Sequence, residues 1–167
     1  PFLMEMVIAA GFFMLCVAIC VSAFVRADHL SRVGQDVNHG VLAAESLVER
    51  VKAGNTEDFG TYEPDEAFGT VFENWRTKDP EASAVYQSIK DGGEVRNYQI
   101  LWDKEWNSYP DTKELEKNGK KLAYVGMITT GVKDQMKEIA VVIFGYGTYG
   151  DQGYKIYHLF AEQYVKP

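Results

Sequence analysis

Glu5 is the residue whose type and setting in this sequence most clearly point to chemistry. It is the only charged residue in residues 2–25, and its neighbours are apolar. A carboxylate inside an apolar membrane segment is costly unless it is paired or neutralised. Pairing with a positive group offsets that cost, so we interpret Glu5 as a candidate assembly residue. Two alternatives stay open: a place at the membrane surface near the amine of its own chain, and a proton relay.

Other side chains that could act in catalysis or bind metal ions are few. Cys16 and Cys20 are the only cysteines, and their spacing places them on one face of a helix, where we expect them to pack as small hydrophobic residues. His29, His39 and His158 are expected to be surface or packing residues. The patterns HExxH, GxSxG, the P-loop and paired metal-binding cysteines do not occur. We therefore predict no catalytic, cofactor-binding or metal-binding residue, and no enzyme.

Two loops carry weaker signals. Residues 145–153 (GYGTYGDQG) are rich in glycine but are followed by neither a helix nor the lysine of a phosphate-binding loop. We predict a hairpin loop there, with an exposed tyrosine patch as the alternative. The acidic residues Glu63, Asp65 and Glu66 could bind calcium, although solvated loop charge is the favoured interpretation.

The apolar run that carries Glu5 is long enough to cross a membrane. Residues 2–25 as a helix would measure about 36 Å, against about 30 Å for the hydrocarbon core of a bilayer. The run is too long for the apolar region of a secretory signal and has no basic segment before it. Arg26 and Asp28 mark its end. Residues 1–28 are predicted to be the transmembrane or filament-core half of a helix.

Residues 29–53 continue that helix in amphipathic form. Apolar residues recur at steps of three or four, the spacing of one helix face: Leu30, Val33, Val37, Val41, Ala44, Val48 and Val51. Gly54 and Asn55, which follow Lys52, predict the end of the helix. No proline interrupts residues 2–53, so we expect one helix about 78 Å long.

The rest of the chain changes from turn-rich to strand-like. Residues 54–93 are predicted to be a connecting region with a short helix near 79–90, which begins with Asp79 as N-cap and Pro80 at the first helical position. Residues 94–167 are predicted to be an antiparallel sheet of about four strands, at 95–102, 122–130, 139–146 and 154–165. The predicted fold is α+β, with the helix packed on one face of the sheet and the other face partly exposed.

Charge and cysteine content exclude some functions. The chain has 17 Lys and Arg against 24 Asp and Glu, a net charge of −7. Residues 1–53 carry 4 basic and 5 acidic residues, which leaves 13 and 19, a net of −6, for residues 54–167. Nucleic-acid binding needs a basic surface and is not expected. The predicted sheet has no cysteine, so packing alone must hold its core.

Residues 1–53 resemble the N-terminal part of a type IV pilin or pseudopilin. The specific features are Phe2-Leu3-Met4-Glu5, with a lone glutamate at the fifth place, the apolar run and the continuing amphipathic helix. The resemblance is strong over residues 1–53 and rests on architecture alone over 54–167. The chain departs from the family pattern at Pro1, where an apolar residue such as Phe is usual. It also lacks the mid-helix proline, near the place of Ser22, so we expect a more continuous helix.

The resemblance implies a structural subunit of a type IV pilus-like filament. A prepilin peptidase would remove a leader, and the new amine, here on Pro1, is usually methylated in the family. Glu5 would pair with the amine of a neighbouring subunit, with Phe2 beside it. Small residues would let helices pack closely in the filament core: Ala9, Ala10, Gly11, Ala18 and Ser22. The partners implied are further copies of the chain in a helical homopolymer, the membrane before assembly, and the pilus assembly machinery.

The expected location is the cytoplasmic membrane for the unassembled subunit and the cell surface for the filament. One alternative is a minor pilin or pseudopilin that primes a type II secretion or competence filament. Another, from a different class, is a membrane-anchored binding module that stays monomeric.

Overall fold

A computed structural model of the chain describes residues 1–62, 67–147 and 153–166, and for residues 67–70 it describes the backbone alone. The acidic cluster near 63–66 and the middle of the glycine-rich loop, 148–152, therefore lie outside the described residues. The chain divides into two compact units, Pro1–Asn38 and His39–Pro167. The second unit includes the last turns of the long helix.

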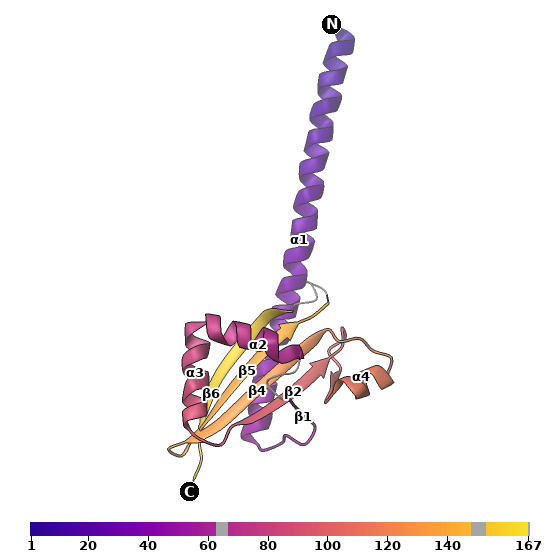
Figure 1. Ribbon diagram of the computed structural model, residues 1–167. Helices are drawn as coiled ribbons and strands as arrows, with labels where there is room; N and C mark the ends of the chain where they lie inside the picture. The colour runs from indigo at the N-terminus through magenta and orange to yellow at the C-terminus, as the bar shows by residue number, and fades with distance from the viewer. Residues whose placement is uncertain (63–66, 148–152, 167) are drawn as a thin grey trace. The chain divides into compact units, whose positions relative to one another are not determined.

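Helix α1, Phe2–Lys52, runs for 51 residues without a break, as predicted (Figure 1). It ends in a Schellman motif, in which Gly54 takes the left-handed conformation with φ +78°. The Asn55 N–H donates to the carbonyl of Arg50 at 2.9 Å, and the Gly54 N–H donates to that of Val51 at 3.2 Å. Gly54 and Asn55 therefore end the helix in the way the sequence indicated.

The strands form one antiparallel sheet with the order β1-β2-β4-β5-β6, and β3 pairs with β2 beside that path. Six strands are present among the described residues, where about four were predicted. The long strands are those predicted, whereas β1 and β3 are two-residue strands that pair only with β2. The bounds are β1 Gly60–Thr61, β2 Arg96–Trp102, β3 Ser108–Tyr109, β4 Tyr124–Lys133, β5 Met136–Gly145 and β6 Tyr154–Tyr164.

The hairpin between β4 and β5 is tighter than expected. Lys133 pairs with Met136, which leaves only Asp134 and Gln135 in the loop. Both have positive φ, 48° and 65°, as the central residues of a type I′ turn require. The strands were predicted to end at 130 and to begin again at 139, but β4 continues to Lys133 and β5 begins at Met136.

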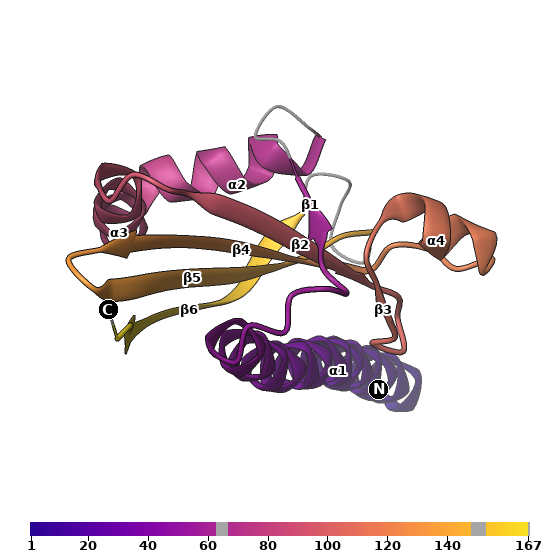
Figure 2. The same ribbon diagram turned by 90° about the horizontal axis from the view of Figure 1, so that it is seen from below.

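Helices pack on both faces of the sheet (Figure 2). On one face, the last turns of α1 contribute Ala44, Leu47, Val48 and Val51 to a core that includes Ile128 and Val141. On the other face, α2 (Ala67–Lys78) and α3 (Pro80–Asp91) contribute Phe72, Tyr86 and Ile89. The expectation of a partly exposed second face was wrong, because the connecting region packs onto that face.

Helix α3 confirms the predicted start at Asp79. The Asp79 side chain accepts from the backbone N–H groups of Glu81 and Ala82, both at 3.1 Å, and Pro80 is the first helical residue. Helix α2 and the short helix α4, Thr112–Lys117, were not predicted. The connecting region is thus more regular than its sequence suggested.

Candidate functional site

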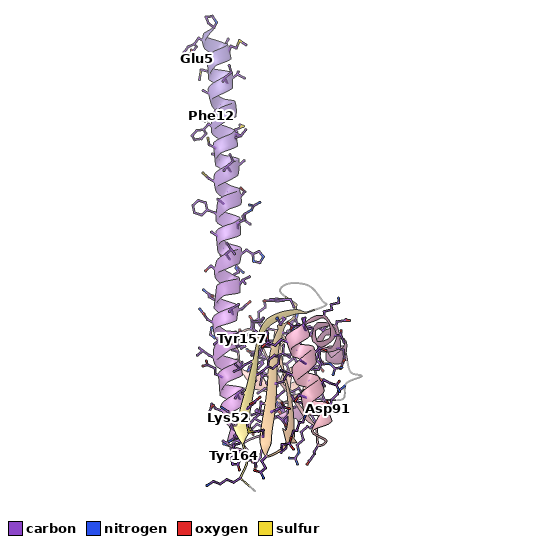
Figure 3. All side chains as sticks on the ribbon, turned by 90° about the vertical axis from the view of Figure 1, so that its left-hand side faces the viewer. Glu5, Phe12, Lys52, Asp91, Tyr157 and Tyr164 are labelled. Atoms are coloured by element: carbon purple, nitrogen blue, oxygen red, sulfur yellow. The ribbon has the colours of Figure 1, made fainter. Side chains whose placement is uncertain are left out.

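The first turns of α1 present an apolar surface that no described part of the chain covers. Phe2, Leu3 and Phe12 are 74%, 80% and 71% exposed. Side chains project from the helix on every side in Figure 3, which labels Glu5 and Phe12. A helix that is apolar all round is stable in lipid or among other helices, not in water. This half of α1 is a candidate membrane anchor, since it is long and apolar enough to cross a bilayer.

Glu5 lies in the first turn of this helix with its side chain exposed. Its backbone N–H donates to the carbonyl of Pro1 at 3.1 Å, which fixes the turn. Within the described ranges, no ion pair involves Glu5 or the amine of Pro1. In an apolar medium such a carboxylate is costly unless it is paired or neutralised.

The predicted small packing residues do not all share a face. At 3.6 residues per turn, Gly11, Ala18 and Ser22 lie along one side of α1, and Ala9 and Ala10 lie on others. Ala9 shares the side that carries Glu5. The Ser22 hydroxyl donates to the carbonyl of Ile19 at 2.8 Å, so it brings no unpaired donor into an apolar medium. Neighbouring helices could approach closely on more than one side.

Cys16 and Cys20 are free thiols on the same side of α1 as Glu5. Cys16 is half-buried and Cys20 is exposed. Neither contributes to the two core clusters of the second unit. Their packing partners, if they act as small hydrophobic residues, must be lipid or another chain.

Two of the histidines make ring contacts. His39 stacks on Trp106 with 5.4 Å between ring centres, and His158 contacts Trp75 at 5.4 Å. Burial, followed by the charge of Lys155, lowers the pKa of His158. His29 lies on the exposed surface of α1. In the part of the chain that the structure describes, no three His, Cys, Asp or Glu side chains are placed to hold a metal ion.

The tight turn from Asp103 to Asn107 was missed from the sequence. Asp103 is only 2% exposed, and one of its carboxylate oxygens accepts from the backbone N–H groups of Glu105 and Asn107 at 2.9 and 3.0 Å. Trp106 has a positive φ of 62°, a rare conformation for a bulky residue. It places the indole on Tyr124, with ring centres 4.0 Å apart, and beside His39. The turn thereby packs the last turns of α1 against the sheet.

Comparison with models of protein families, with curated protein sequences and with solved structures gives no match for this chain. The features that bear on function are therefore those of the chain itself. They are the exposed apolar run of residues 2–25, which has one carboxylate, and an α+β unit that has a core on both faces of its sheet.

Proposed function

We propose that this chain is a structural subunit of a type IV pilus-like filament. The observation that carries the proposal is the apolar half of α1, which is exposed all round and holds the single carboxylate of Glu5. A plain membrane anchor needs the apolar surface but has no use for a charge within it. Assembly through packed helices accounts for both the apolar surface and the charge of Glu5 within it.

In the proposed filament the apolar helices of neighbouring subunits exchange lipid contacts for contacts with one another. Small side chains on several sides of α1 permit close approach. Glu5 pairs with the N-terminal amine of a neighbour, as the resemblance to pilins implies, and each charge offsets the desolvation of the other. Because the pair is dry, its electrostatic attraction is strong and fixes the axial position at which subunits stack.

The proposed assembly is heterologous and open, so it grows as a helix. Before assembly the subunit lies in the cytoplasmic membrane, and the same helix anchors it there. A prepilin peptidase and the pilus assembly machinery are the proposed processing and assembly partners. The unit that begins at His39 forms the outer surface of the filament.

Replacement of the carboxylate tests the proposal. Glu5→Ala should remove the chain from the sheared surface fraction and leave its amount in the membrane fraction unchanged. Glu45→Ala is the matched control, because Glu45 is an exposed glutamate on the same helix outside the apolar run. Both fractions are measured by immunoblot.

Normal assembly of Glu5→Ala, or the absence of the wild-type chain from every sheared fraction, would overturn the filament proposal. A monomeric, membrane-anchored binding module would then be the better account. The molar share of the chain in purified filaments distinguishes a major subunit from a minor pilin or pseudopilin.

A further inference from the structure

Strand β6, Tyr154–Tyr164, is the last strand of the sheet, and among the described strands it pairs only with β5. At the opposite edge, β1 and β3 pair with β2 and cover part of its length. Within the unit that begins at His39, Figure 3 shows β6 between the last turns of α1 and helix α3. Strand β6 is therefore the long open edge of the described sheet.

The hydrogen bonds of β6 show which of its backbone groups face outward. The Val165 N–H donates to the Gln135 carbonyl at 2.8 Å, so Val165 faces β5. Backbone groups alternate in direction along a strand, and the register is regular from Tyr164 back to Tyr157. The residues whose N–H and C=O groups point away from β5 are His158, Phe160, Glu162 and Tyr164. In the part of the chain that the structure describes, no strand pairs with these outer groups.

The middle of this edge lacks the features that usually prevent pairing with another chain. Natural sheets protect an open edge with lysine, proline, a bulge or a cover. Residues 157–161 (YHLFA) contain neither lysine nor proline, and the irregularity in the ladder lies before Tyr157. Their side chains are half-buried, although the facing residues of β5 are buried. An added strand would cover both the outer backbone groups and these apolar side chains.

An open cleft lies beside this edge, on the face of the sheet that carries α3. Its volume is about 310 Å³, which at roughly 30 Å³ for each water molecule holds about ten waters. The cleft is thus large enough for one long side chain from an added strand. Its lining residues come from α3, β5 and β6: Val85, Glu138, Phe160, Ala161 and Glu162.

The two carboxylates of the cleft have no positive partner among the described residues. Glu138 and Glu162 are directly opposite each other on β5 and β6, where like charges destabilise a sheet. Oε1 of Glu138 accepts from the Ser88 hydroxyl at 2.8 Å, whereas its Oε2 is buried as an atom and has no partner within the described ranges. None of the ion pairs that described residues form involves either glutamate. A positive group in the cleft would offset their repulsion.

A lysine or arginine side chain fits this cleft better than a metal ion does. Calcium takes about 6–8 oxygen ligands, whereas the cleft offers two carboxylates, one of which already accepts from Ser88. Val85 and Phe160 form an apolar wall on which the methylene groups of a basic side chain can pack while its charged end reaches the carboxylates. The open edge and the cleft therefore favour the same ligand, an extended chain with a basic residue.

We propose that the open edge of β6 binds an extended segment of a partner protein as an added strand, with a Lys or Arg side chain of that segment between Glu138 and Glu162. Backbone hydrogen bonds to Phe160 and Glu162 hold the segment, and the cleft selects the basic residue. The inference does not depend on the filament proposal, because every residue of the site lies within the unit that begins at His39.

Fluorescence anisotropy of a labelled peptide with the full chain in detergent micelles tests this site. The probe is a capped peptide of about eight residues, in which Thr and Val alternate and one central residue is Lys. It should bind saturably, and a peptide with Arg in place of the Lys should bind as well. Glu in place of the Lys should weaken binding by about tenfold, because hydrogen bonds between charged groups are replaced by repulsion.

Methylation of the peptide backbone distinguishes an added strand from other modes of binding. A residue opposite Glu162 directs its backbone groups to β6, as do the residues two places before and after it. Methylation of the amide nitrogens two places from the Lys should therefore abolish binding. Methylation of those one place from the Lys, which point away from β6, should leave binding unchanged.

Glu138→Gln and Glu162→Gln should each weaken binding of the Lys peptide, because each removes one negative charge and keeps the size of the side chain. Glu105→Gln is the matched control, since Glu105 is an exposed glutamate in the turn after β2, and it should bind the peptide as the wild type does.

The proposal is overturned if neither the Lys nor the Arg peptide binds saturably, or if both glutamine variants of the cleft bind the Lys peptide as the wild type does. It is also overturned if methylation at the two kinds of position has the same effect. Saturable binding of Ca²⁺ without binding of either peptide would assign the carboxylates to a metal ion and would overturn it too.

Discussion

At the scale of single residues, two carboxylates lie in opposite settings. Asp103 is almost fully buried, and it accepts from backbone N–H groups, from Nδ2 of Asn107 and from the Tyr109 hydroxyl. Glu5 is exposed on an apolar helix and forms no ion pair with any described residue. A carboxylate satisfied within the chain stabilises the fold, whereas one in an apolar medium is costly unless it is paired or neutralised.

Asp103→Asn should destabilise the unit that contains the sheet by about 1–3 kcal/mol. The new amide would place its N–H groups against the donors that now bind the carboxylate, and it cannot satisfy them all. Chemical unfolding at pH 7, followed by circular dichroism, measures the change in the free energy of unfolding. Glu105→Gln is the control, since that side chain is exposed. Equal stabilities of Asp103→Asn and wild type would contradict the role of the turn.

The same carboxylate should make stability depend on pH. Burial alone would raise the pKa of Asp103, but the hydrogen bonds from Asn107 and Glu105 and the charge of Lys120 outweigh burial and lower it below the ordinary 3.8. A group with a depressed pKa in the folded state stabilises the protein above its unfolded pKa. That stabilisation is lost as the pH falls below 3.8 and through the folded-state value.

We therefore expect the stability difference between wild type and Asp103→Asn to be constant near neutral pH and to shrink below about pH 4. Urea unfolding at a series of pH values measures it. A difference that stays constant down to pH 2 would show that folding does not lower the pKa of this carboxylate.

At the scale of elements, the two halves of α1 differ in the exposure and packing of their side chains. The first half is exposed and apolar on all sides, and the last turns carry one buried stripe that packs on the sheet. Gly40 lies where the helix packs closely on β6, because a Cβ added there would meet Cγ2 of Ile156 at 2.9 Å. Gly34 has open space around it among the described residues.

The two glycines should respond differently to alanine. Gly34→Ala should favour the helix by up to about 1 kcal/mol, the difference in helix propensity. Gly40→Ala gains the same propensity but forces the helix and β6 apart, so we expect a net loss of about 1–2 kcal/mol. Thermal unfolding of the two variants in micelles compares them. A Gly40→Ala protein that is more stable than Gly34→Ala would contradict the close packing of α1 on β6.

The elements predicted from the sequence are those with strong local signals. Helix α1 follows from its apolar pattern and Gly54, α3 from Asp79 and Pro80, and the long strands from their β-branched and aromatic residues. Helix α2 has Gly69 within it, so tertiary packing of Phe72 and Trp75 stabilises it more than propensity does. The two-residue strands β1 and β3 exist only through pairing with β2, which no local pattern encodes.

The candidate functional residues also differ in whether a local sequence signal predicts them. Glu5 could be found from the sequence because its apolar neighbours are adjacent in the chain. The Asp103 turn was missed, because its effect depends on Trp106 reaching Tyr124 and His39 across the fold.

At the scale of the whole molecule, the two units differ in how many of their side chains are buried. Both hydrophobic cores lie within the unit that begins at His39, and they include the last turns of α1. The unit Pro1–Asn38 contains no buried side chain. The residues that form the buried cores are therefore different from those of the exposed apolar surface.

A chain that begins at His39 should fold without residues 1–38 and should be monomeric in water. It keeps both cores and the residues of the Asp103 turn, and it loses the exposed apolar surface. Sedimentation and cooperative thermal unfolding measure its state, with the full chain in micelles as the reference. A truncated chain that aggregates or unfolds without cooperativity would show that the first unit is needed for folding.

Helical reconstruction of the proposed filament by electron cryo-microscopy would locate α1 and Glu5 in neighbouring subunits. We expect the apolar halves of α1 to pack together in the filament core. We also expect a Glu5 carboxylate oxygen within about 4 Å of the N-terminal amine of a neighbouring subunit. A filament in which Glu5 faces solvent, or in which these helices lie outside the core, would contradict the proposed assembly.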